Sequence, residues 1–179
     1  MIIRDASPQD APAVAAIYGP IVRDTAISFE TEPPTPDEMA RRVAATLPDF
    51  PWLAAEEDGA FLGYAYAGAH RPTASYRWSA NVSIYLAETA RGRGVGKALY
   101  RDLLARLRRQ GICSVFAGIA LPNSASVALH ESVGFAPVGV YRRVGYKLGA
   151  WRDVGWWGQS LVDDDSPPPE FIPYRDLRQ

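Results

Sequence analysis

The sequence predicts a single mixed α/β domain. Segments with the two-residue periodicity of strands alternate along the chain with segments that gather apolar side chains on one helical face. The length of 179 residues fits one domain, and a chain of this size buries roughly 70 % of its unfolded surface. Hydrophobic residues make up 47 % and charged residues 22 %, which predicts a packed core and excludes disorder throughout.

The first half of the chain is expected to hold a strand, two helices and a hairpin. The segment Thr35–Glu38 matches a capping box with proline at the first helical position, which predicts a helix start. Asp58-Gly59 lies between two apolar runs and is typical of a hairpin turn. The expected elements are a strand at 1–5, a helix after Ser7 that reaches about Ile21 with Ala13, Val14 and Ile17 on the same face, an extended loop at 24–34, a helix to about Leu47, and hairpin strands at 52–57 and 61–69.

The second half is expected to continue the alternation. Leu99, Leu103, Leu104 and Leu107 recur at helical spacing and predict a buried helix face. The expected elements are a loop at 71–78, a central strand at 81–86, a helix at 94–110, a strand at 114–120, a short helix at 123–133, and strands at 137–146 and 153–161. We place the domain at residues 1–162. Residues 163–179 form an acidic, proline-rich tail that we expect to wrap the surface or to be partly disordered.

Composition narrows the function. Nineteen Lys and Arg against twenty Asp and Glu give a net charge of −1, which argues against a nucleic-acid binder. No run approaches the ~20 apolar residues of a membrane span, and the charged N-terminus is unlike a signal peptide. The single Cys113 fits a reducing cytoplasm, and we expect an inert core thiol. Two histidines far apart in sequence, His70 and His130, predict no zinc site.

The strongest local motif is a glycine-rich turn at residues 91–97, between a predicted strand and a predicted helix. Glycines let the backbone approach a ligand, and the first amides of a helix bind anions. Arg91 and Ala98 stand where a P-loop needs glycine and a hydroxyl residue, and the spacing departs from the G-x-G-x-x-G dinucleotide motif. The remaining pattern, Arg-x-x-Gly-x-Gly, is met by Arg91, Gly94 and Gly96; a glycine-rich loop without a ligand is the alternative.

This turn resembles the pyrophosphate loop of the GNAT superfamily of acetyl-CoA-dependent N-acetyltransferases. Residues 118–135 resemble the second half of the superfamily pattern, in which Asn123 precedes a short helix. Residues 28–38 and 141–157 resemble the phosphinothricin and methionine sulfoximine N-acetyltransferase branch. The resemblance covers nearly all of Ile2–Leu161. It implies a mixed, mostly antiparallel sheet that is splayed between two strands and flanked by about four helices.

The resemblance also implies where acetyl-CoA binds. The cofactor would lie between the splayed strands, which end near Leu86 and Gly118, and its pantetheine would pair with strand backbone. The Leu86 N–H is the candidate donor to the thioester carbonyl, because a fixed backbone donor needs no reorganisation. Asn123 and Ser126 also suit a helix N-terminus. The expected cofactor-binding residues are Ile84, Tyr85, Leu86, Arg91, Gly92, Arg93, Gly94, Val95, Gly96, Lys97, Asn123 and Ser126.

Two further positions carry the expected chemistry. His130 matches the proton donor of this branch, and a histidine that titrates near neutrality could protonate the leaving thiolate; a packed histidine is the alternative. Asn81 stands where the phosphinothricin enzymes have a glutamate base, and an amide cannot accept a proton at pH 7. Asn81 could orient a water instead. Tyr100 also matches a position near the cofactor, although as an inward helix residue it suits the core.

Acceptor selection is expected from Phe29, the loop at 70–78 and the segment 142–147. Arg71 and Arg77 could pair with the carboxylate and phosphinate of an amino-acid analogue, or could be solvated surface arginines. The expected substrate-binding residues are Phe29, Arg71, Pro72, Thr73, Tyr76 and Arg77. Trp78, Trp151, Trp156 and Trp157 suit packing or dimer contacts, and the resemblance suggests a homodimer.

We therefore expect a cytoplasmic enzyme that transfers acetyl directly from acetyl-CoA to the amino group of a small amino-acid-like acceptor, without a metal. One alternative acceptor is a protein N-terminus or a polyamine, although arginines in the acceptor loop argue against a polyamine. The other alternative is a CoA-binding sensor that has lost catalysis, an option that Asn81 keeps open.

Overall fold

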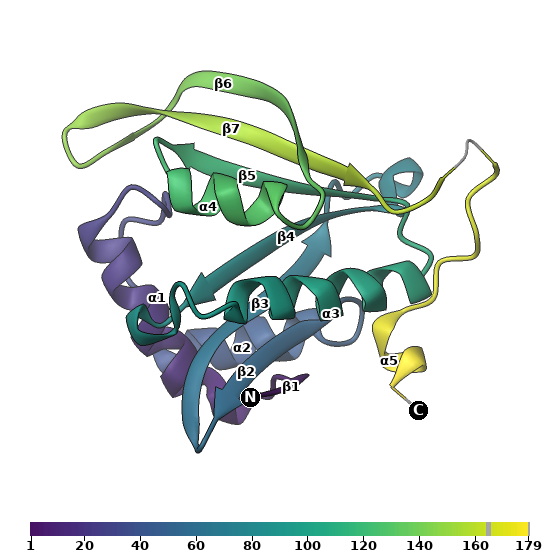
Figure 1. The fold of residues 1–179 in the computed structure, drawn as a ribbon, viewed down its shortest axis with the longest axis horizontal. Helices are drawn as coiled ribbons and strands as arrows, with labels where there is room; N and C mark the ends of the chain where they lie inside the picture. Colours follow the sequence, from purple (N-terminus) through teal and green to yellow (C-terminus); the bar gives the residue numbers. More distant parts are fainter. Residues whose placement is uncertain (164–165, 179) are drawn as a thin grey trace.

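A seven-stranded sheet forms the centre of the protein in this computed structural model, which describes residues 1–163 and 166–178 (Figure 1). The strand order is β1-β2-β3-β4-β5-β7-β6, and every neighbouring pair except β4–β5 is antiparallel. The strands are β1 (Ile2–Asp5), β2 (Trp52–Glu57), β3 (Ala60–Ala69), β4 (Ser79–Leu86), β5 (Ser114–Leu121), β6 (Ala136–Lys147) and β7 (Ala150–Ser160). This arrangement confirms the predicted single α/β domain with a mostly antiparallel sheet.

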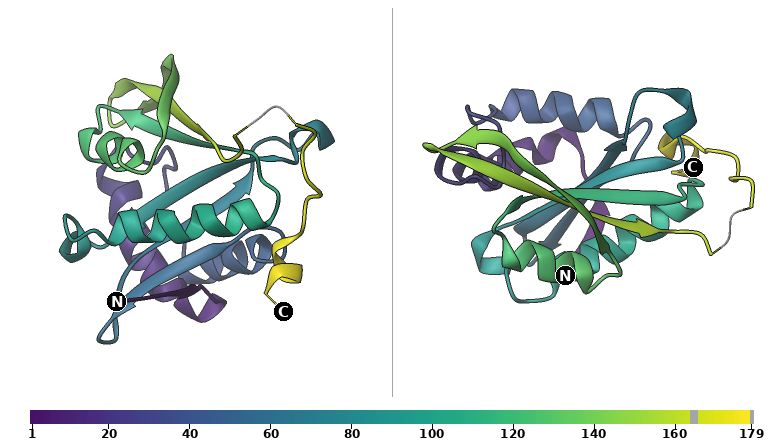
Figure 2. Two further views of the ribbon diagram at one scale, coloured as in Figure 1. Left: turned by 45° about the vertical axis from the view of Figure 1, so that its right-hand side comes forward. Right: turned by 90° about the horizontal axis from the view of Figure 1, so that it is seen from above.

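Helices cover both faces of the sheet (Figure 2). They are α1 (Ala11–Asp24), α2 (Pro36–Thr46), α3 (Val95–Arg109), α4 (Ser124–Glu131) and the short α5 (Tyr174–Leu177). The first two lie on one face and α3 and α4 on the other. As predicted, the Thr35 side chain caps α2 by accepting from Glu38 N–H. Helix α1 runs three residues further than predicted, to Asp24, because Ile21 and Val22 both pack inward on its last turn.

The hairpin turn between β2 and β3 follows the sequence prediction. Asp58 and Gly59 have φ values of 51° and 79°, which are the left-handed angles of a two-residue turn whose twist matches the flanking strands. Strands β3 and β4 then pair along their length, and Gly68 stands opposite Asn81.

The sheet splits between β4 and β5. Only three residues of each strand pair, Ser79–Asn81 with Ser114–Phe116. Beyond them the residues from Val82 to Leu86 leave β5, whereas β5 stays paired with β7 along its whole length. The expected splay is therefore present, and its closed end lies at Asn81 and Phe116.

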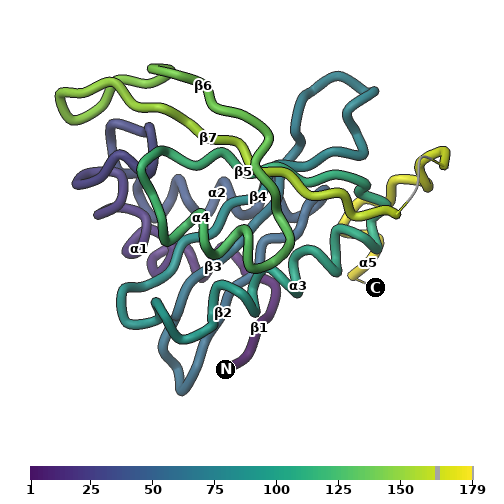
Figure 3. The backbone as a smooth tube through the Cα atoms, turned by 45° about the horizontal axis from the view of Figure 1, so that its top comes forward, coloured from purple at the N-terminus to yellow at the C-terminus, as the bar shows by residue number. Residues whose placement is uncertain are grey.

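Strands β6 and β7 form a hairpin that reaches out at one edge of the molecule (Figure 3). Almost all of β6 is exposed, although it carries large apolar side chains. The exposed large apolar residues of the hairpin are Val138, Val140, Tyr141, Val144, Tyr146, Leu148 and Trp151.

The C-terminal tail returns to the domain. Tyr174 is 2 % exposed and Ile172 N–H donates to Gln110 O at the end of α3. Trp78 Nε1 also donates to Pro169 O at 2.7 Å. Residues 164–165 and 179 of the predicted tail lie outside the described residues.

Candidate active site

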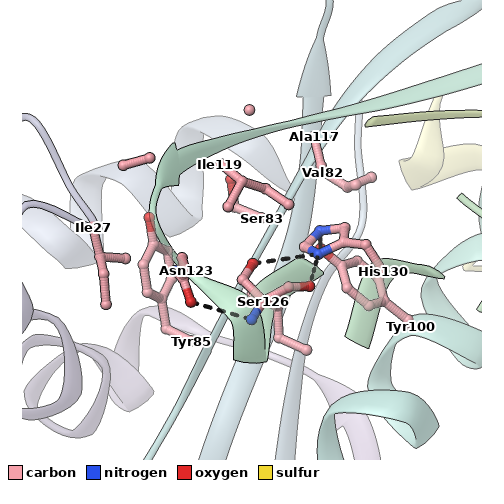
Figure 4. Close-up of a pocket in the computed structure, with 13 residues that line it drawn as sticks. Ile27, Val82, Ser83, Tyr85, Tyr100, Ala117, Ile119, Asn123, Ser126 and His130 are labelled. Carbon is pink, nitrogen blue, oxygen red and sulfur yellow. Dashed lines mark hydrogen bonds between the residues drawn. The ribbon is translucent and has the colours of Figure 1, made fainter. Parts of the chain in front are cut away.

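A cleft opens where β4 and β5 separate, and α3 and α4 close one side of it (Figure 4). Val82–Tyr85 form one wall and Ala117–Ala120 the other, starting one residue beyond the last β4–β5 pair. The remaining lining residues are Ile27, Tyr100, Asn123, Ser126 and His130. Five chain segments thus converge on the split.

The open edge of β4 presents backbone amides to this cleft. Ala87 N–H donates to Leu62 O of β3, and successive amides of a strand point to opposite edges. The amides of Ile84 and Leu86 therefore face the split, whereas that of Tyr85 faces β3, where Tyr85 stands opposite Tyr64. This corrects the expectation that pantetheine pairs with backbone at all three residues. Tyr85 contributes its side chain to the cleft instead.

The glycine-rich turn forms a cradle next to the cleft. Gly94 is the N-cap of α3 at φ +82°, and a side chain there would be strained. Gly96 faces the side chain of Leu129, so its missing Cβ lets α3 and α4 approach. The expected residues that line the cradle are Ile84, Tyr85, Leu86, Arg91, Gly92, Gly94, Val95, Gly96, Lys97, Asn123 and Ser126. The cradle is also lined by Ile21, Ile27, Ala90, Ala125 and Leu129.

Arg93 does not line the cradle, which departs from the sequence expectation. Its guanidinium forms an ion pair with Glu57 at the end of β2. The same carboxylate pairs with the N-terminal amine at 3.3 Å. Glu57 therefore draws Arg93 toward the β2–β3 turn and away from any ligand at the start of α3.

His130 is buried and both of its ring nitrogens have partners. The Nδ1 atom lies 2.7 Å from Ser126 O, a carbonyl that can only accept, so Nδ1 carries the proton. The Nε2 atom then accepts from the Tyr100 hydroxyl at 2.7 Å. Burial lowers the pKa of His130, against a smaller opposing effect of the Ser126 hydrogen bond. This corrects the expectation of titration near neutrality: His130 is held neutral.

Tyr100 belongs to the site more closely than the sequence suggested. It is fully buried, as expected for the inward face of α3, but it also lines the cleft and holds His130. Burial raises the pKa of its hydroxyl well above the ordinary value. Asn123 caps α4 as predicted, because its side chain accepts from Ser126 N–H at 3.2 Å.

Asn81 lies at the closed end of the split, and the structure gives it a partner that sequence reasoning missed. Its Oδ1 atom is 2.9 Å from Nδ1 of His70, which follows β3. The His70 ring packs on Phe116 at 4.8 Å and meets the edge of Trp156 at 6.5 Å between centroids. The contact joins residues 11 apart through the pairing of β3 with β4.

The predicted acceptor loop lies outside the cleft. Arg71, Pro72, Thr73, Tyr76 and Arg77 are exposed and do not line the walls described above. Arg77 Nε donates to Ala74 O, and its guanidinium lies over Trp78. The structure therefore brings together the expected cofactor residues and His130, and it leaves these five at the rim beyond His70.

Phe29 and Lys147 join the loop after α1 to the β6–β7 hairpin. The Phe29 ring lies against Gly145, where a side chain would collide with it. Lys147 is buried and donates to Val22 O and Ser28 O, both at 2.6 Å. These bonds hold the loop that brings Ile27 to the cleft.

The residues present suit acetyl-CoA. The cradle combines a helix N-terminus, glycines and Lys97, which is the chemistry that binds a pyrophosphate. Open amides on β4 can pair with the pantetheine arm. Within the described residues, no group of His, Cys, Asp and Glu is arranged as metal ligands. Across residues 1–163 and 166–178, every helix lacks the length or the apolar character of a membrane span.

Comparisons with known proteins agree with this geometry. Phosphinothricin N-acetyltransferase of Streptomyces viridochromogenes is 38 % identical over 167 residues, which cover 93 % of this chain and 91 % of that protein. L-methionine sulfoximine/L-methionine sulfone acetyltransferase of Pseudomonas paraeruginosa is 36 % identical over 171 residues, with 93 % and 98 % covered. A GNAT superfamily phosphinothricin acetyltransferase from Sinorhizobium meliloti, solved in complex with acetyl-CoA, superposes with a TM-score of 0.90 at 34 % identity, with 98 % and 96 % covered. Residues 3–156 match the acetyltransferase (GNAT) domain, and the chain belongs to the GNAT family of acetyltransferases.

Proposed function

We propose that this protein transfers the acetyl group of acetyl-CoA to the amino group of a small amino-acid-like acceptor of the phosphinothricin or methionine sulfoximine type. The observation that carries the proposal is the continuous surface from the glycine cradle through the open edge of β4 to Tyr100 and His130. Relatives named for these two acceptors support the substrate class. Transfer is direct, within a ternary complex.

The backbone holds the thioester. Acetyl-CoA supplies the activated acetyl group, and the cradle amides with Lys97 hold its pyrophosphate. Leu86, whose N–H was expected to bind the thioester carbonyl, lines only the cradle, whereas Ile84 lines both the cradle and the cleft. We therefore assign the carbonyl to the Ile84 amide and the pantetheine to Leu86. A fixed backbone donor stabilises the negative charge that develops on this oxygen.

Tyr100 and His130 lie on the α3 side of the cleft and serve the sulfur. At neutral pH the Tyr100 hydroxyl donates to His130 Nε2, so the pair keeps its geometry and offers no proton. His130 thus fixes the orientation of the Tyr100 hydroxyl beside the position of the sulfur. The leaving thiolate takes up its proton from water in the cleft, next to this neutral pair.

We further propose that the protein works in the cytoplasm as a homodimer. Its one cysteine is a free thiol, and burial raises the pKa of that thiol, which suits a reducing compartment. The exposed apolar side chains of the β6–β7 hairpin form a patch of the kind that associates with a partner surface, here a second copy of the chain. The contact of Phe29 with Gly145 would place the loop after α1 beside the dimer contact. Sedimentation velocity of wild type and a Val140→Lys/Tyr146→Lys variant tests this, and a wild-type monomer would refute it.

The function is tested by release of CoA thiol from acetyl-CoA in the presence of single acceptors. The panel contains phosphinothricin, methionine sulfoximine, methionine sulfone, ordinary amino acids, polyamines and short peptides. We expect turnover on the amino-acid analogues and little on polyamines, with the N-acetyl product identified by mass spectrometry. Acetylation of peptides alone, or of none of these amines, would contradict the proposed substrate class.

A further inference from the structure

The closed end of the split holds a histidine with one unengaged ring nitrogen. His70 is half-buried, and Asn81, Tyr76, Phe116 and Trp156 surround its ring. Its Nδ1 atom is bonded to Asn81, whereas Nε2 has no hydrogen-bond partner in residues 1–163 and 166–178. The inference below rests on the proposed acetyl transfer and concerns the step in which the acceptor amine loses its proton.

The partner atom determines the tautomer of His70. The Asn81 Oδ1 atom is an amide oxygen, which accepts hydrogen bonds and cannot donate them. His70 therefore carries its proton on Nδ1, and the lone pair is on Nε2. A histidine whose one nitrogen is held by a carbonyl-type oxygen and whose other is free has the arrangement of a general base.

His70 and Asn81 lie on the face of the sheet opposite to Tyr100 and His130. Val115 and Ala117 of β5 pack into the core under α3, so Phe116 between them points to the other face, and His70 packs on Phe116. One face thus holds the groups that serve the sulfur. We place the acceptor amine on the other face, which holds His70 and Asn81.

The spacing along β4 leaves room for the acceptor amine and a water between Asn81 and the carbonyl site. Ile84 is three residues beyond Asn81, and a strand rises about 3.3 Å per residue, so the Ile84 amide lies about 10 Å from Asn81 along β4. We place the acceptor amine and one bridging water in that span. From Leu86 the span would be about 16 Å, which is a second reason to place the carbonyl at Ile84.

Other titratable groups near the split are engaged. Glu30 accepts from the Arg42 guanidinium at 2.8 Å and from the Tyr18 hydroxyl at 2.9 Å. The Arg42 hydrogen bond holds the pKa of the Glu30 carboxyl below its ordinary value. Burial raises the pKa of Tyr66 on the same face. Of the described side chains that contact His70, only that of Tyr76 carries an ionisable group, and Arg71 is the adjacent charged residue in the sequence.

We propose that His70, oriented by Asn81, is the general base of this acetyltransferase. The acceptor ammonium loses a proton through water to His70 Nε2. The nitrogen lone pair then forms the N–C bond to the acetyl carbonyl carbon, the C–S bond breaks, and the electron pair leaves with the CoA sulfur, which takes up a proton. The second amine proton is released on amide formation, so the products are the N-acetyl acceptor, CoA thiol and one proton. Asn81 thus retains a role as a positioning residue without accepting a proton.

Two substitutions of His70 separate proton transfer from packing. His70→Gln can still donate to Asn81 but cannot accept a proton at neutral pH, and His70→Phe keeps a ring against Phe116. We measure kcat/KM for the acceptor from pH 6 to 9.5 and the Kd of acetyl-CoA by calorimetry. Both variants should lose about 10²-fold in kcat/KM at pH 7, with an unchanged acetyl-CoA Kd. Wild-type kcat/KM should level off at neutral pH, whereas that of the variants should rise until the acceptor amine itself titrates.

Two rescue experiments complete the test. Added imidazole should restore part of the activity of His70→Gln, and Asn81→Glu should restore activity in the His70→Phe background, because a carboxylate then stands beside the acceptor. Wild-type pH dependence in His70→Gln, or a loss confined to acetyl-CoA affinity, would overturn the role of His70 while the proposed function stands. Failure of wild type to acetylate any acceptor would instead overturn the proposed function.

Discussion

The two histidines of the chain lie on opposite faces of the same split, and their surroundings differ in one decisive respect. On the α3 face, His130 is 3 % exposed and both ring nitrogens are bonded, to Ser126 O and to the Tyr100 hydroxyl. On the other face, His70 is half-buried, and among the described residues it has a partner at Nδ1 alone. A histidine exchanges protons with a substrate through a free ring nitrogen. The family resemblance pointed to His130, but the ring nitrogens of His130 are less available to a substrate than Nε2 of His70.

The two histidines differ in burial, and this difference affects the charge that each ring can carry. Around His130, apolar neighbours such as Phe135 disfavour a charged ring, and the pKa of His130 falls. That site keeps a neutral, oriented pair behind the sulfur. The His70 ring is only half-buried, and we expect water and the amine to reach Nε2. We therefore expect the α3 face to position the acetyl-CoA sulfur and the His70 face to admit the acceptor amine.

The largest expected change in stability concerns the buried pair. His130→Phe removes the acceptor of the Tyr100 hydroxyl, and an unpartnered buried hydroxyl costs about 1–3 kcal/mol. The double variant Tyr100→Phe/His130→Phe leaves neither group unpartnered, so it should be destabilised by less than the sum of the single variants. Urea unfolding of the four proteins measures this coupling. Additive single effects would show that the two side chains are independent.

The same pair predicts a pH dependence of the free energy of unfolding. Burial lowers the pKa of His130 in the folded protein, whereas an unfolded histidine titrates near 6.5. The unfolded chain therefore binds the proton first, and stability should be complete above about pH 6.5 and decrease as the pH falls below it. His130→Phe should flatten this decrease between pH 8 and 5.5. The pKa values of the Asp10 and Glu30 carboxyl groups are also lowered in the folded protein. These two groups affect the free energy of unfolding only at more acidic pH, near their ordinary pKa values of 3.8 and 4.5.

If the free energy of unfolding of His130→Phe fell more steeply than that of wild type between pH 8 and 5.5, the lowered pKa assigned to His130 would be wrong. His70→Gln is the matched control, because it replaces the other histidine. Measured at the same pH values, it shows what the exposed site contributes to the slope.

The helix cap and the turns could be predicted from the sequence, because each depends on only a few consecutive residues. The Thr35 cap, the Asp58-Gly59 turn and the left-handed Gly94 at the start of α3 each depend on neighbouring residues alone. The glycine cradle could be recognised for the same reason. Its glycines lie within one short segment, residues 91–97, whereas Asn123 and Ser126 reach the cradle from the start of α4.

The contacts that decide function join distant segments. His70 meets Asn81 only because β3 and β4 pair in the register that sets Gly68 opposite Asn81. Lys147 reaches Val22 O across 125 positions of the sequence. No local pattern encodes either contact, so sequence reasoning grouped Lys147 with the acceptor-selecting segment, and it placed His70 in the acceptor loop without a catalytic role.

The smallest expected effect concerns two cations of the glycine turn and sharpens the description of the α3 face. Lys97 lines the cradle, and no salt bridge is formed by it within the described residues, whereas Arg93 is paired with Glu57. Lys97→Ala should therefore raise the Kd of acetyl-CoA roughly fivefold, about 1 kcal/mol for a typical hydrogen bond, and Arg93→Ala less than twofold. Calorimetry at low and high salt measures both Kd values, and the Lys97 effect should shrink as salt screens the charge.

Glu57→Gln is the control, because this substitution releases Arg93 from its ion pair. If Glu57→Gln binds acetyl-CoA more tightly than wild type, and if adding Arg93→Ala removes that gain, then Glu57 keeps the Arg93 charge away from the ligand. An equal loss from Arg93→Ala and Lys97→Ala in the native background would instead mean that Arg93 leaves Glu57 for the ligand.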